Sequence, residues 1–398
     1  MATVSGPFVN NGHEVVIAEA VRTPIGKSHP EKGWFRTTHP NAMLAACYTD
    51  LIARSGLDPA VVEDLVIGCT APFGEQSRNI GRNAWLQAGY PAEVPATTLD
   101  RRCGSAQTSV NFAAALVASG VHDVVIAGGV EHMGHVPMNS PAKISELYGE
   151  PWPAELRARY DFVTQGESAE LIAERWDISR TEMDEFAVRS HALATDAIEA
   201  GRFVDEMVKM ELDGEIRIGD QTVRPGTSLE SLAKLKTVFR EENGRVTAGT
   251  SSPICDSAAA VLLCTREAAD KYGLRIRARI ADQTTVGVDP IIMLTGPIPA
   301  TRKILSRNNL TVSDIDLFEV NEAFSSVVLA WQRELKPDED RVNVNGGAIA
   351  LGHAVGATGS RLIATLLSEM ERRDTHLGLV TMCCGGGLGT GTLIERVD

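Results

Sequence analysis

Two cysteines and a histidine stand in turns whose composition favours chemistry over packing. His353 lies within GGAIALGHAVGATGSR, Cys383 within TMCCGGGLGTG, and Cys103 within TLDRRCGSAQ. Glycine permits positive φ and a close approach of backbone N–H groups to a ligand, so the two glycine-rich turns are candidate cradles for an oxyanion or a thioester. The three side chains therefore predict thiol-based acyl chemistry.

Cys103 stands between a predicted strand and a predicted helix. The segment VPATTL reads as extended, and SAQTSVNFAAALVASG reads as a helix of small residues. The free N–H groups and the positive dipole end of a helix favour a thiolate, so we expect the pKa of Cys103 to fall from roughly 8.5 toward neutrality. Strand, cysteine turn and helix would together form a platform for a nucleophile.

The elements around the other two turns follow from apolar patterning. Runs at 341–344 and 377–382 predict strands, and 360–373 predicts a helix with one apolar face. That face carries Leu362, Leu366 and Met370. Along the whole chain, short apolar strands alternate with helical patterns, which indicates a largely parallel sheet covered by helices.

The chain also repeats itself at an offset of about 250 residues. The strand pattern at 64–68 returns at 316–320, and the pattern near Val125 returns near Val380. The cysteine turn at residue 103 corresponds in the same way to the histidine turn at 353. We therefore expect a duplicated α/β unit.

Three regions follow from this repeat. Residues 1–133 form the first half, completed by about 251–275, and residues 276–398 form the second half. Residues 134–250 differ in character, with charged helices and polar turns, and are interpreted as an inserted domain. Loops carried on a rigid scaffold often determine specificity, so we expect this insertion to recognise the substrate.

Composition narrows the class of protein. With 398 residues, of which 43% are hydrophobic, the chain can bury a large core over two or three domains. The net charge of −14 argues against a nucleic-acid surface. No apolar run approaches the ~20 residues of a membrane span, and the N-terminus shows no secretory signal. The seven cysteines lack paired short spacings, as in proteins of a reducing compartment, so we expect a cytoplasmic protein.

Taken in order, the motifs resemble those of the thiolase family, and of actinobacterial degradative thiolases in particular. They are EAVRTPIGK, DRRCGS, AGGVEHM, GTSSPICDSAAA, NEAF at 321–324, GGAIALGHAVGATGSR and the turn Cys383-Cys384-Gly385. The resemblance implies an α/β fold of two βαβαβαββ halves in a five-layer α/β/α/β/α core, with a loop domain inserted in the first half.

The resemblance also implies roles for individual residues. Cys103 would be the acyl-accepting nucleophile and Cys383 the acid/base cysteine. His353 would activate the thiols and donate to an oxyanion together with a water held by Asn321. The backbone N–H groups of Cys103 and Gly385 would form a second oxyanion site.

Coenzyme A (CoA) is implied as a substrate, with no permanently bound cofactor and no metal. Arg224, Ser231 and Ser252 occupy positions that line the CoA groove in the family. Family members assemble as homodimers or homotetramers, so the expected partners are CoA and acyl-CoA molecules and further copies of the chain.

A few positions leave alternatives open. The adjacent Cys383 and Cys384 could exchange roles, but the family pattern places a glycine two residues after the catalytic cysteine, which favours Cys383. His132 and His135 would either line the acyl pocket or cap a turn. In NEAF, Asn321 and Glu322 could also cap a helix.

The expected reaction is thiolysis of a 3-ketoacyl-CoA by CoA, giving acetyl-CoA and a shortened acyl-CoA through acyl-Cys103, in fatty-acid or steroid side-chain β-oxidation. Acetoacetyl-CoA formation by an acetyl-CoA C-acetyltransferase and a non-catalytic acyl-CoA carrier are the alternatives. Condensing enzymes of the ketoacyl synthase kind use one cysteine, so the second cysteine favours a thiolase.

Overall fold

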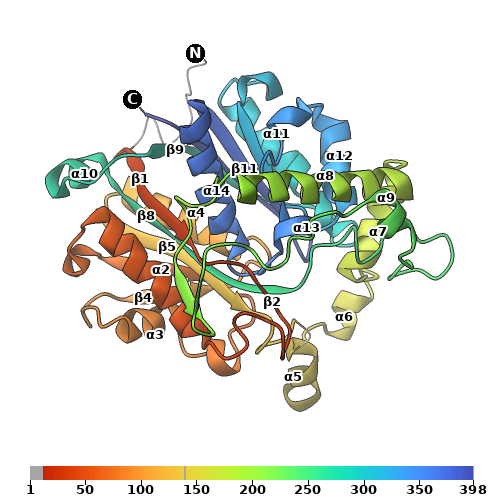
Figure 1. Ribbon diagram of the computed structural model, residues 1–398, viewed down its shortest axis with the longest axis horizontal. Coiled ribbons are helices and arrows are strands. Elements are labelled where there is room, and N and C mark those ends of the chain that lie inside the picture. The colour runs from red at the N-terminus through yellow and green to blue at the C-terminus, as the bar shows by residue number, and fades with distance from the viewer. Residues whose placement is uncertain (1–11, 139, 398) are drawn as a thin grey trace.

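The computed structural model describes residues 12–138 and 140–397 (Figure 1). Residues 1–11, the first part of the N-terminal segment for which no secretory signal is expected, lie outside these ranges. Within them, no helix combines the length and the apolar character that crossing a membrane requires.

The N-terminal half has the predicted order of strands and helices. Its elements are β1 (Val15–Arg22), β2 (Gly26–Lys27), α2 (Pro40–Ser55), β3 (Asp64–Gly68), α3 (Ile80–Gln87), β4 (Ala96–Leu99), α4 (Ser105–Ala118), β5 (Val124–His132), β8 (Cys255–Thr265) and α10 (Arg266–Tyr272). The strands pair in the order β4-β3-β5-β8-β1, parallel from β4 to β5 and antiparallel from β5 to β1. β5 and β8 are buried along their whole lengths, and each contains a long apolar run, at 124–130 and 258–264, typical of strands covered on both faces.

The C-terminal half repeats this arrangement. Its elements are β9 (Ala278–Gly287), α11 (Pro297–Arg307), β10 (Leu317–Val320), α12 (Ser325–Leu335), α13 (Ala348–Leu351), α14 (Thr358–Arg373), β11 (Leu377–Cys384) and β12 (Leu388–Glu395). Its strands pair as β10-β11-β12-β9, with the same sequence of parallel and antiparallel neighbours as β3-β5-β8-β1. The predicted duplication is confirmed, but the expectation of a largely parallel sheet is wrong. In the main sheet of the described residues only β3–β4, β3–β5 and β10–β11 pair in parallel, and the other neighbouring strands are antiparallel. Apolar runs identify buried strands but do not specify their direction.

One predicted strand of the second half is wrong. Instead of a strand at 341–344 there are two isolated parallel bridges, which join Val342 to Phe318 and Val344 to Gly346. The cause is Asn343, whose φ of 47° is left-handed and ends the extended run. Its side chain exchanges hydrogen bonds with the backbone of Val320 at 2.8 and 2.9 Å, in place of a strand ladder.

Three hydrophobic clusters separate the layers of the fold. The first lies between α2 and α3 and one face of the N-terminal strands. The second surrounds α4 and α14, which pack against each other in the centre, and the third lies beneath α11 and α12. The predicted apolar face of α14 belongs to the central cluster. These clusters give the five-layer α/β/α/β/α order, with the N-terminal half at lower left in Figure 1 and the C-terminal half at upper right.

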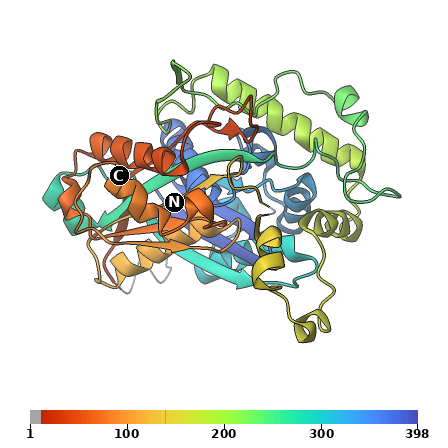
Figure 2. The same ribbon diagram turned by 90° about the horizontal axis from the view of Figure 1, so that it is seen from below.

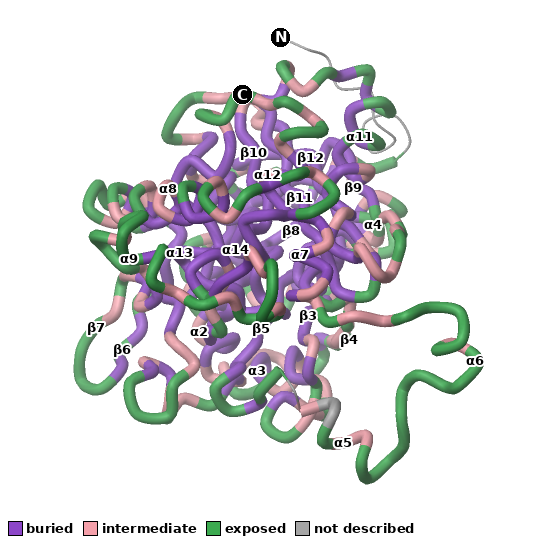
Figure 3. The backbone as a smooth tube through the Cα atoms, turned by 90° about the vertical axis from the view of Figure 1, so that its right-hand side faces the viewer, coloured by how far each residue is buried: buried purple, intermediate pink, exposed green. Residues whose placement is uncertain are grey.

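The segment between β5 and β8 contains the remaining elements. They are α5 (Ser140–Tyr148), α6 (Ala154–Arg157), α7 (Gln165–Arg175), α8 (Arg180–Glu199), β6 (Met210–Leu212), β7 (Glu215–Arg217) and α9 (Leu229–Ala233). α8 begins with a capping box of Ser179 and Glu182, and both α7 and α8 pack on α12. α5 and α6 form an excursion that extends away from the body, as Figure 3 shows, whereas α8 lies across the C-terminal half in Figure 2.

Candidate active site

The turn that carries Cys103 is fixed by local hydrogen bonds. Oδ1 of Asp100 accepts from the backbone N–H of Arg102 at 2.7 Å, and Arg102 adopts the left-handed φ of 50° that turns the chain. Gly104 is the N-cap of α4, and Cys103 is the residue immediately before this cap. The thiol is buried, with 2% of the residue exposed.

The backbone N–H groups of Cys103 itself and of Gly385 lie near enough to the Cys103 sulfur to affect its pKa. They lower the pKa of the thiol, yet burial has the larger effect and raises this pKa to about 11. The expected shift toward neutrality is therefore wrong in direction, because the helix entrance is enclosed by the central core. A buried thiol of this kind needs a base to remove its proton.

His353 lies in a turn whose backbone conformation requires glycine at the preceding position. Gly352 has φ of 98°, and a Cβ there would lie 2.7 Å from Sγ of Cys255. The His353 backbone N–H donates to the carbonyl oxygen of Pro253 at 3.3 Å, which holds the turn against the segment that leads into β8. The turn ends where α14 begins at Thr358.

Thr358 determines the proton position on the His353 ring. Its hydroxyl donates its proton to the carbonyl oxygen of Ala354 at 2.8 Å. The hydroxyl oxygen, Oγ1 of Thr358, must therefore act as the acceptor toward Nδ1 of His353, which lies 2.7 Å away. Nε2 is then unprotonated. Burial, and secondarily the charge of Arg361, lower the pKa of His353 to about 3, so the imidazole is neutral at pH 7 and Nε2 is a free base.

Asn321 lies beside that free nitrogen. It follows β10, and its amide Nδ2 is 3.5 Å from Nε2 of His353. Its Oδ1 atom is buried and accepts no hydrogen bond within the described residues. The amide oxygen thus offers an acceptor to a small polar molecule next to the imidazole.

The two adjacent cysteines at the end of β11 have different surroundings. Cys383 is fully buried, and burial, followed by the proximity of Cys103, raises its pKa. Cys384 packs against the backbone beneath the nucleophile turn, where a Cβ on Gly104 would lie 2.6 Å from its Sγ. Sγ of Cys384 also interacts with the backbone of Gly104 and the hydroxyl of Thr390, as a packed structural thiol does.

Three adjoining cavities are lined by most of the predicted residues, but Asn321 and Cys383 line none of the three. A central cavity of about 310 Å³ is lined by Cys103, His353 and Ser252. Toward α9 it shares Ser251 and Pro253 with a second cavity of about 270 Å³. This α9-side cavity is lined by Arg224 and Ser231.

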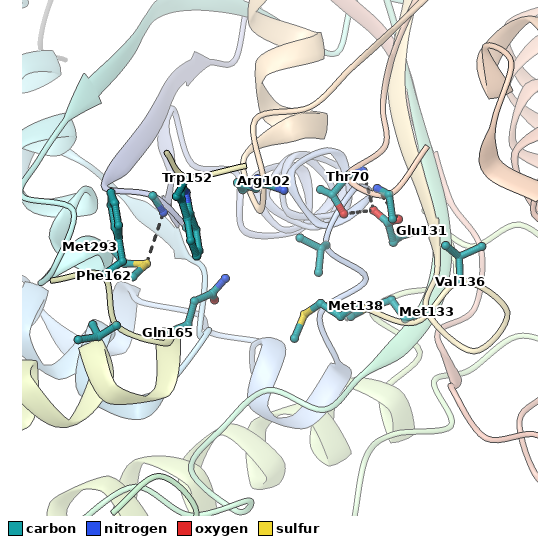
Figure 4. A pocket seen from close by; sticks show the side chains of 15 residues that line it. Thr70, Arg102, Glu131, Met133, Val136, Met138, Trp152, Phe162, Gln165 and Met293 are labelled. Atoms are coloured by element: carbon teal, nitrogen blue, oxygen red, sulfur yellow. Dashed lines mark hydrogen bonds between the residues drawn. The ribbon is translucent and has the colours of Figure 1, made fainter. Parts of the chain in front are cut away.

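The third cavity, of about 380 Å³, includes Gly385 and opens on the other side of the central one. In Figure 4, Trp152 and Met293 stand on one side of it and Thr70 and Glu131 on the other, with Gln165 reaching between them. The two cavities share Met133, Met138, Gln165 and Val355. We call the third one the aromatic cavity.

Sequence reasoning missed several residues of this site. Thr358 could have been found from its place five residues after His353, at the start of the predicted helix. Trp152 and Phe162, which stack with ring centroids 5.1 Å apart in the aromatic cavity, carry no local motif and come together only through the fold of the excursion.

Two open alternatives are settled by geometry. His132 accepts from the backbone N–H of His135 at 3.1 Å, the rings stack at 3.8 Å, and His132 Nε2 contacts the carbonyl oxygen of Phe35, so these histidines hold a turn. Asn321 and Glu322 do not cap α12, because that helix begins at Ser325 and has no side-chain cap.

Two family models together match nearly the whole chain. The chain matches the model of the thiolase N-terminal domain over residues 15–267 and that of the thiolase C-terminal domain over residues 274–396. The chain belongs to the thiolase family. It is accordingly an acyltransferase of the family that uses CoA as a substrate.

Individual relatives cover nearly the whole thiolase. The steroid 3-ketoacyl-CoA thiolase FadA6 of Mycobacterium tuberculosis is 43% identical, over 99% of this chain and 98% of the relative. The 3-ketoacyl-CoA thiolase of Shewanella loihica is 43% identical over 96% of this chain and 99% of the relative.

Solved thiolase structures share the fold. The human mitochondrial 3-ketoacyl-CoA thiolase aligns with a TM-score of 0.89 and 31% identity, over 97% of this chain and 99% of the other. The Bacillus anthracis acetyl-CoA acetyltransferase aligns with a TM-score of 0.88 and 35% identity, over 98% and 100%. The predicted family and fold are confirmed.

Proposed function

We propose that this thiolase cleaves 3-ketoacyl-CoA with CoA, giving acetyl-CoA and an acyl-CoA shorter by two carbons. The proposal rests on one arrangement above all. The Cys103 sulfur lies near the backbone N–H groups of Cys103 and Gly385 and shares a cavity with a neutral His353 whose Nε2 is unprotonated. A protonated thiol, a base and two fixed donors are what acyl transfer to sulfur requires.

The first half of the reaction forms the acyl-enzyme. Nε2 of His353 takes the thiol proton, and the Cys103 sulfur attacks the 3-keto carbon. The keto oxygen then carries negative charge, which the N–H groups of Cys103 and Gly385 stabilise. Loss of one such donor typically lowers the rate by ~10²–10³.

Cleavage of the bond between C2 and C3 expels the enolate of acetyl-CoA and leaves the acyl group on Cys103. The enolate oxygen is held by the imidazolium of His353 and by a water on Asn321, whose buried Oδ1 is a suitable acceptor for that water. Cys383 gives its proton to C2, which completes acetyl-CoA.

The second half returns the enzyme to its first state. The thiol of CoA transfers its proton to Cys383 and attacks the acyl-Cys103 thioester. The tetrahedral oxyanion is again held by the backbone N–H groups of Cys103 and Gly385. It collapses by breaking the bond between the acyl carbon and the Cys103 sulfur, which releases the shortened acyl-CoA, and the Cys103 thiolate then regains its proton from the imidazolium of His353. Because burial raises the pKa of Cys383, its thiolate is a stronger base than that of CoA, and the transfer of the CoA proton to Cys383 is favourable.

The adjoining cavities support a binding mode. CoA extends from Arg224 and Ser231 in the α9-side cavity, past Ser252, to the Cys103 sulfur. The acyl group enters the aromatic cavity, where Trp152 and Phe162 form a flat apolar wall. This wall favours acyl groups longer than that of acetoacetyl-CoA and supports fatty-acyl or steroid side-chain β-oxidation as the setting.

The proposal also includes the domain organisation, the assembly and the cellular setting of the protein. Residues 134–250 act as the inserted recognition domain between the half of 1–133, completed by 251–275, and the half of 276–398. The family resemblance supports a homodimer or homotetramer, and the seven free, buried cysteines agree with a reducing, cytoplasmic setting. Light scattering coupled to gel filtration tests the assembly.

Product analysis tests the reaction. The protein is mixed with CoA and either acetoacetyl-CoA, a long 3-ketoacyl-CoA or a 3-ketoacyl-CoA bearing a steroid ring system, and thioesters are separated by chromatography. Acetyl-CoA together with the shortened acyl-CoA supports the proposal, and the preferred substrate identifies the setting. Turnover of acetoacetyl-CoA alone would favour the acetyltransferase, and binding without products would favour the carrier.

A further inference from the structure

The carboxylate of Glu322 is the centre of a buried hydrogen-bond cluster behind the catalytic turns. Glu322 is 1% exposed and accepts from the Ser190 hydroxyl at 2.6 Å, from Nδ2 of Asn343 at 2.9 Å and from the backbone N–H of Ile349 at 3.1 Å. The three donors come from three different segments. Ser190 lies in α8, Asn343 lies in the connection between α12 and α13, and Ile349 lies in α13. Neither the reaction steps above nor a helix cap uses this side chain.

Its position links the two residues that hold the enolate oxygen. Asn321 directly precedes Glu322 in the chain, and α13, whose backbone Glu322 fixes, ends at Leu351 just before the His353 turn. One carboxylate is therefore attached to the backbone on both sides of the 3.5 Å contact between Asn321 Nδ2 and His353 Nε2.

The carboxylate lies close against the turn that carries Gly346 and Gly347. A Cβ on Gly347 would lie 2.1 Å from the carboxyl carbon of Glu322. A Cβ on Gly346, which has φ of 75°, would lie 2.5 Å from the carbonyl oxygen of Ser190. Both glycines let α8 and the carboxylate approach the turn at a distance that any side chain would prevent.

Ser190 extends the cluster into the inserted segment. Its hydroxyl donates to Glu322 and accepts from the backbone N–H of Gly347 at 3.1 Å. The next residue of α8, His191, lines the α9-side cavity and accepts from the backbone N–H of Arg224 at 3.2 Å. Figure 1 shows α13 directly beneath α8, and the two helices are in contact.

We propose that Glu322, held by Ser190, is a positioning residue that sets the Asn321 amide against the His353 imidazole and thereby builds the enolate oxyanion site. Glu322 touches no reacting atom. It acts by fixing two backbone segments, and a displacement of about 1 Å in a reacting geometry can lower a rate by roughly 10²-fold.

The inference rests on the proposed thiolase reaction and distinguishes two of its steps, cleavage of the C2–C3 bond and exchange of the acyl group with CoA. Cleavage of the C2–C3 bond requires the Asn321 and His353 pair. Exchange of the acyl group between Cys103 and CoA relies for its oxyanion on the backbone N–H groups of Cys103 and Gly385. A positioning defect at Glu322 thus slows cleavage selectively, whereas a general loss of structure slows both.

The test uses Glu322→Gln, which keeps the shape of the side chain but turns an N–H₂ group toward donors that need an acceptor. Ser190→Ala makes the same test from α8 and serves if the first variant does not fold. Ser325→Ala is the matched control, because it removes another buried hydrogen bond between α12 and α8, from Ser325 to the carbonyl oxygen of Met183 at 3.0 Å.

Two rates are measured for each protein: the first turnover of acetyl-CoA release from a 3-ketoacyl-CoA, and isotope exchange between acetyl-CoA and labelled CoA. For Glu322→Gln we expect cleavage to fall by about 10- to 100-fold while exchange stays within about 3-fold. Ser190→Ala should show a smaller shift of the same kind, and Ser325→Ala none.

Equal losses in both rates, or no loss in either, would overturn the positioning role. Failure of the proposed function looks different, because the unaltered protein would then show neither cleavage nor exchange.

Discussion

The imidazole of His353 donates a hydrogen bond from Nδ1 to Oγ1 of Thr358 over 2.7 Å. Since that hydroxyl donates its own proton to the carbonyl oxygen of Ala354, the ring is held in the tautomer in which Nε2 is unprotonated. The base of the proposed mechanism is thus set by a residue at the first position of α14.

Thr358→Val keeps the shape of the side chain and removes the acceptor. We expect kcat for thiolysis to fall by roughly 10²-fold, the lower range for a lost general base, with a smaller change in KM. Thr358→Ser retains the hydroxyl and should stay within a few fold of the unaltered enzyme. Steady-state kinetics of the three proteins check this, and an unchanged kcat in Thr358→Val would show that the ring needs no such partner.

The depressed pKa of His353 makes stability depend on pH. Between the ordinary value of 6.5 and about 3, the unfolded chain binds a proton at this residue that the folded protein does not bind. Stability therefore falls as pH falls through that window, by up to about 1.4 kcal/mol per pH unit from this one group.

His353→Gln removes that contribution and leaves the other titrating groups in place. Urea unfolding of both proteins at pH 7.5 and pH 5 should show the unaltered enzyme losing more stability than the variant on acidification. The same loss in both proteins would mean that His353 is not held neutral by burial.

The two adjacent cysteines should respond differently to removal. Cys383→Ala should still accept an acyl group slowly but lose turnover by several orders of magnitude, because the enolate then has no proton donor. Cys384→Ala removes a packed sulfur next to Gly104, so we expect near-normal turnover and a stability loss of about 1 kcal/mol. Assays of turnover and of thermal unfolding on the pair decide the assignment, and the reverse result would transfer the acid/base role to Cys384.

The aromatic cavity should decide which acyl groups are accepted. Trp152→Ala removes one member of the stacked pair with Phe162, a pair worth about 0.5–1.5 kcal/mol beyond its buried area. We expect kcat/KM for a long or ring-bearing 3-ketoacyl-CoA to fall by about 3- to 10-fold or more, with little change for acetoacetyl-CoA. Tyr148→Ala is the control, since Tyr148 lies on the same excursion but is 84% exposed. Parallel losses for all substrates would contradict a role in acyl recognition.

Much of the fold could be predicted because it depends on local sequence patterns, namely apolar runs and the spacing of apolar residues. The continuous apolar runs of β5 and β11 identify buried strands, and the repeat of these runs reveals two equivalent halves. The helix of α14 follows from the spacing of Leu362, Leu366 and Met370. The failed strand at 341–344 depended on the backbone of Asn343, whose left-handed φ is stabilised by hydrogen bonds to Val320 from elsewhere in the chain.

The site could be predicted only as far as motifs reach. Cys103, His353 and Asn321 stand in recognisable segments, and the fold brings them together as expected. The pKa of Cys103 was misjudged, because a helix entrance is visible in sequence but the enclosure around it is not. The same holds for Trp152 and for Ser190, whose roles depend on where the inserted segment folds back.

Covalent capture at Cys103 tests the central claim most directly. The unaltered protein and Cys103→Ala are each exposed briefly to a 3-ketoacyl-CoA, and the intact mass and the modified peptide are determined before and after CoA is added. The account predicts an acyl adduct on Cys103 that CoA discharges, and no adduct in the variant. An adduct of equal amount in Cys103→Ala, or one that CoA leaves in place, would contradict the assignment of Cys103 as the nucleophile.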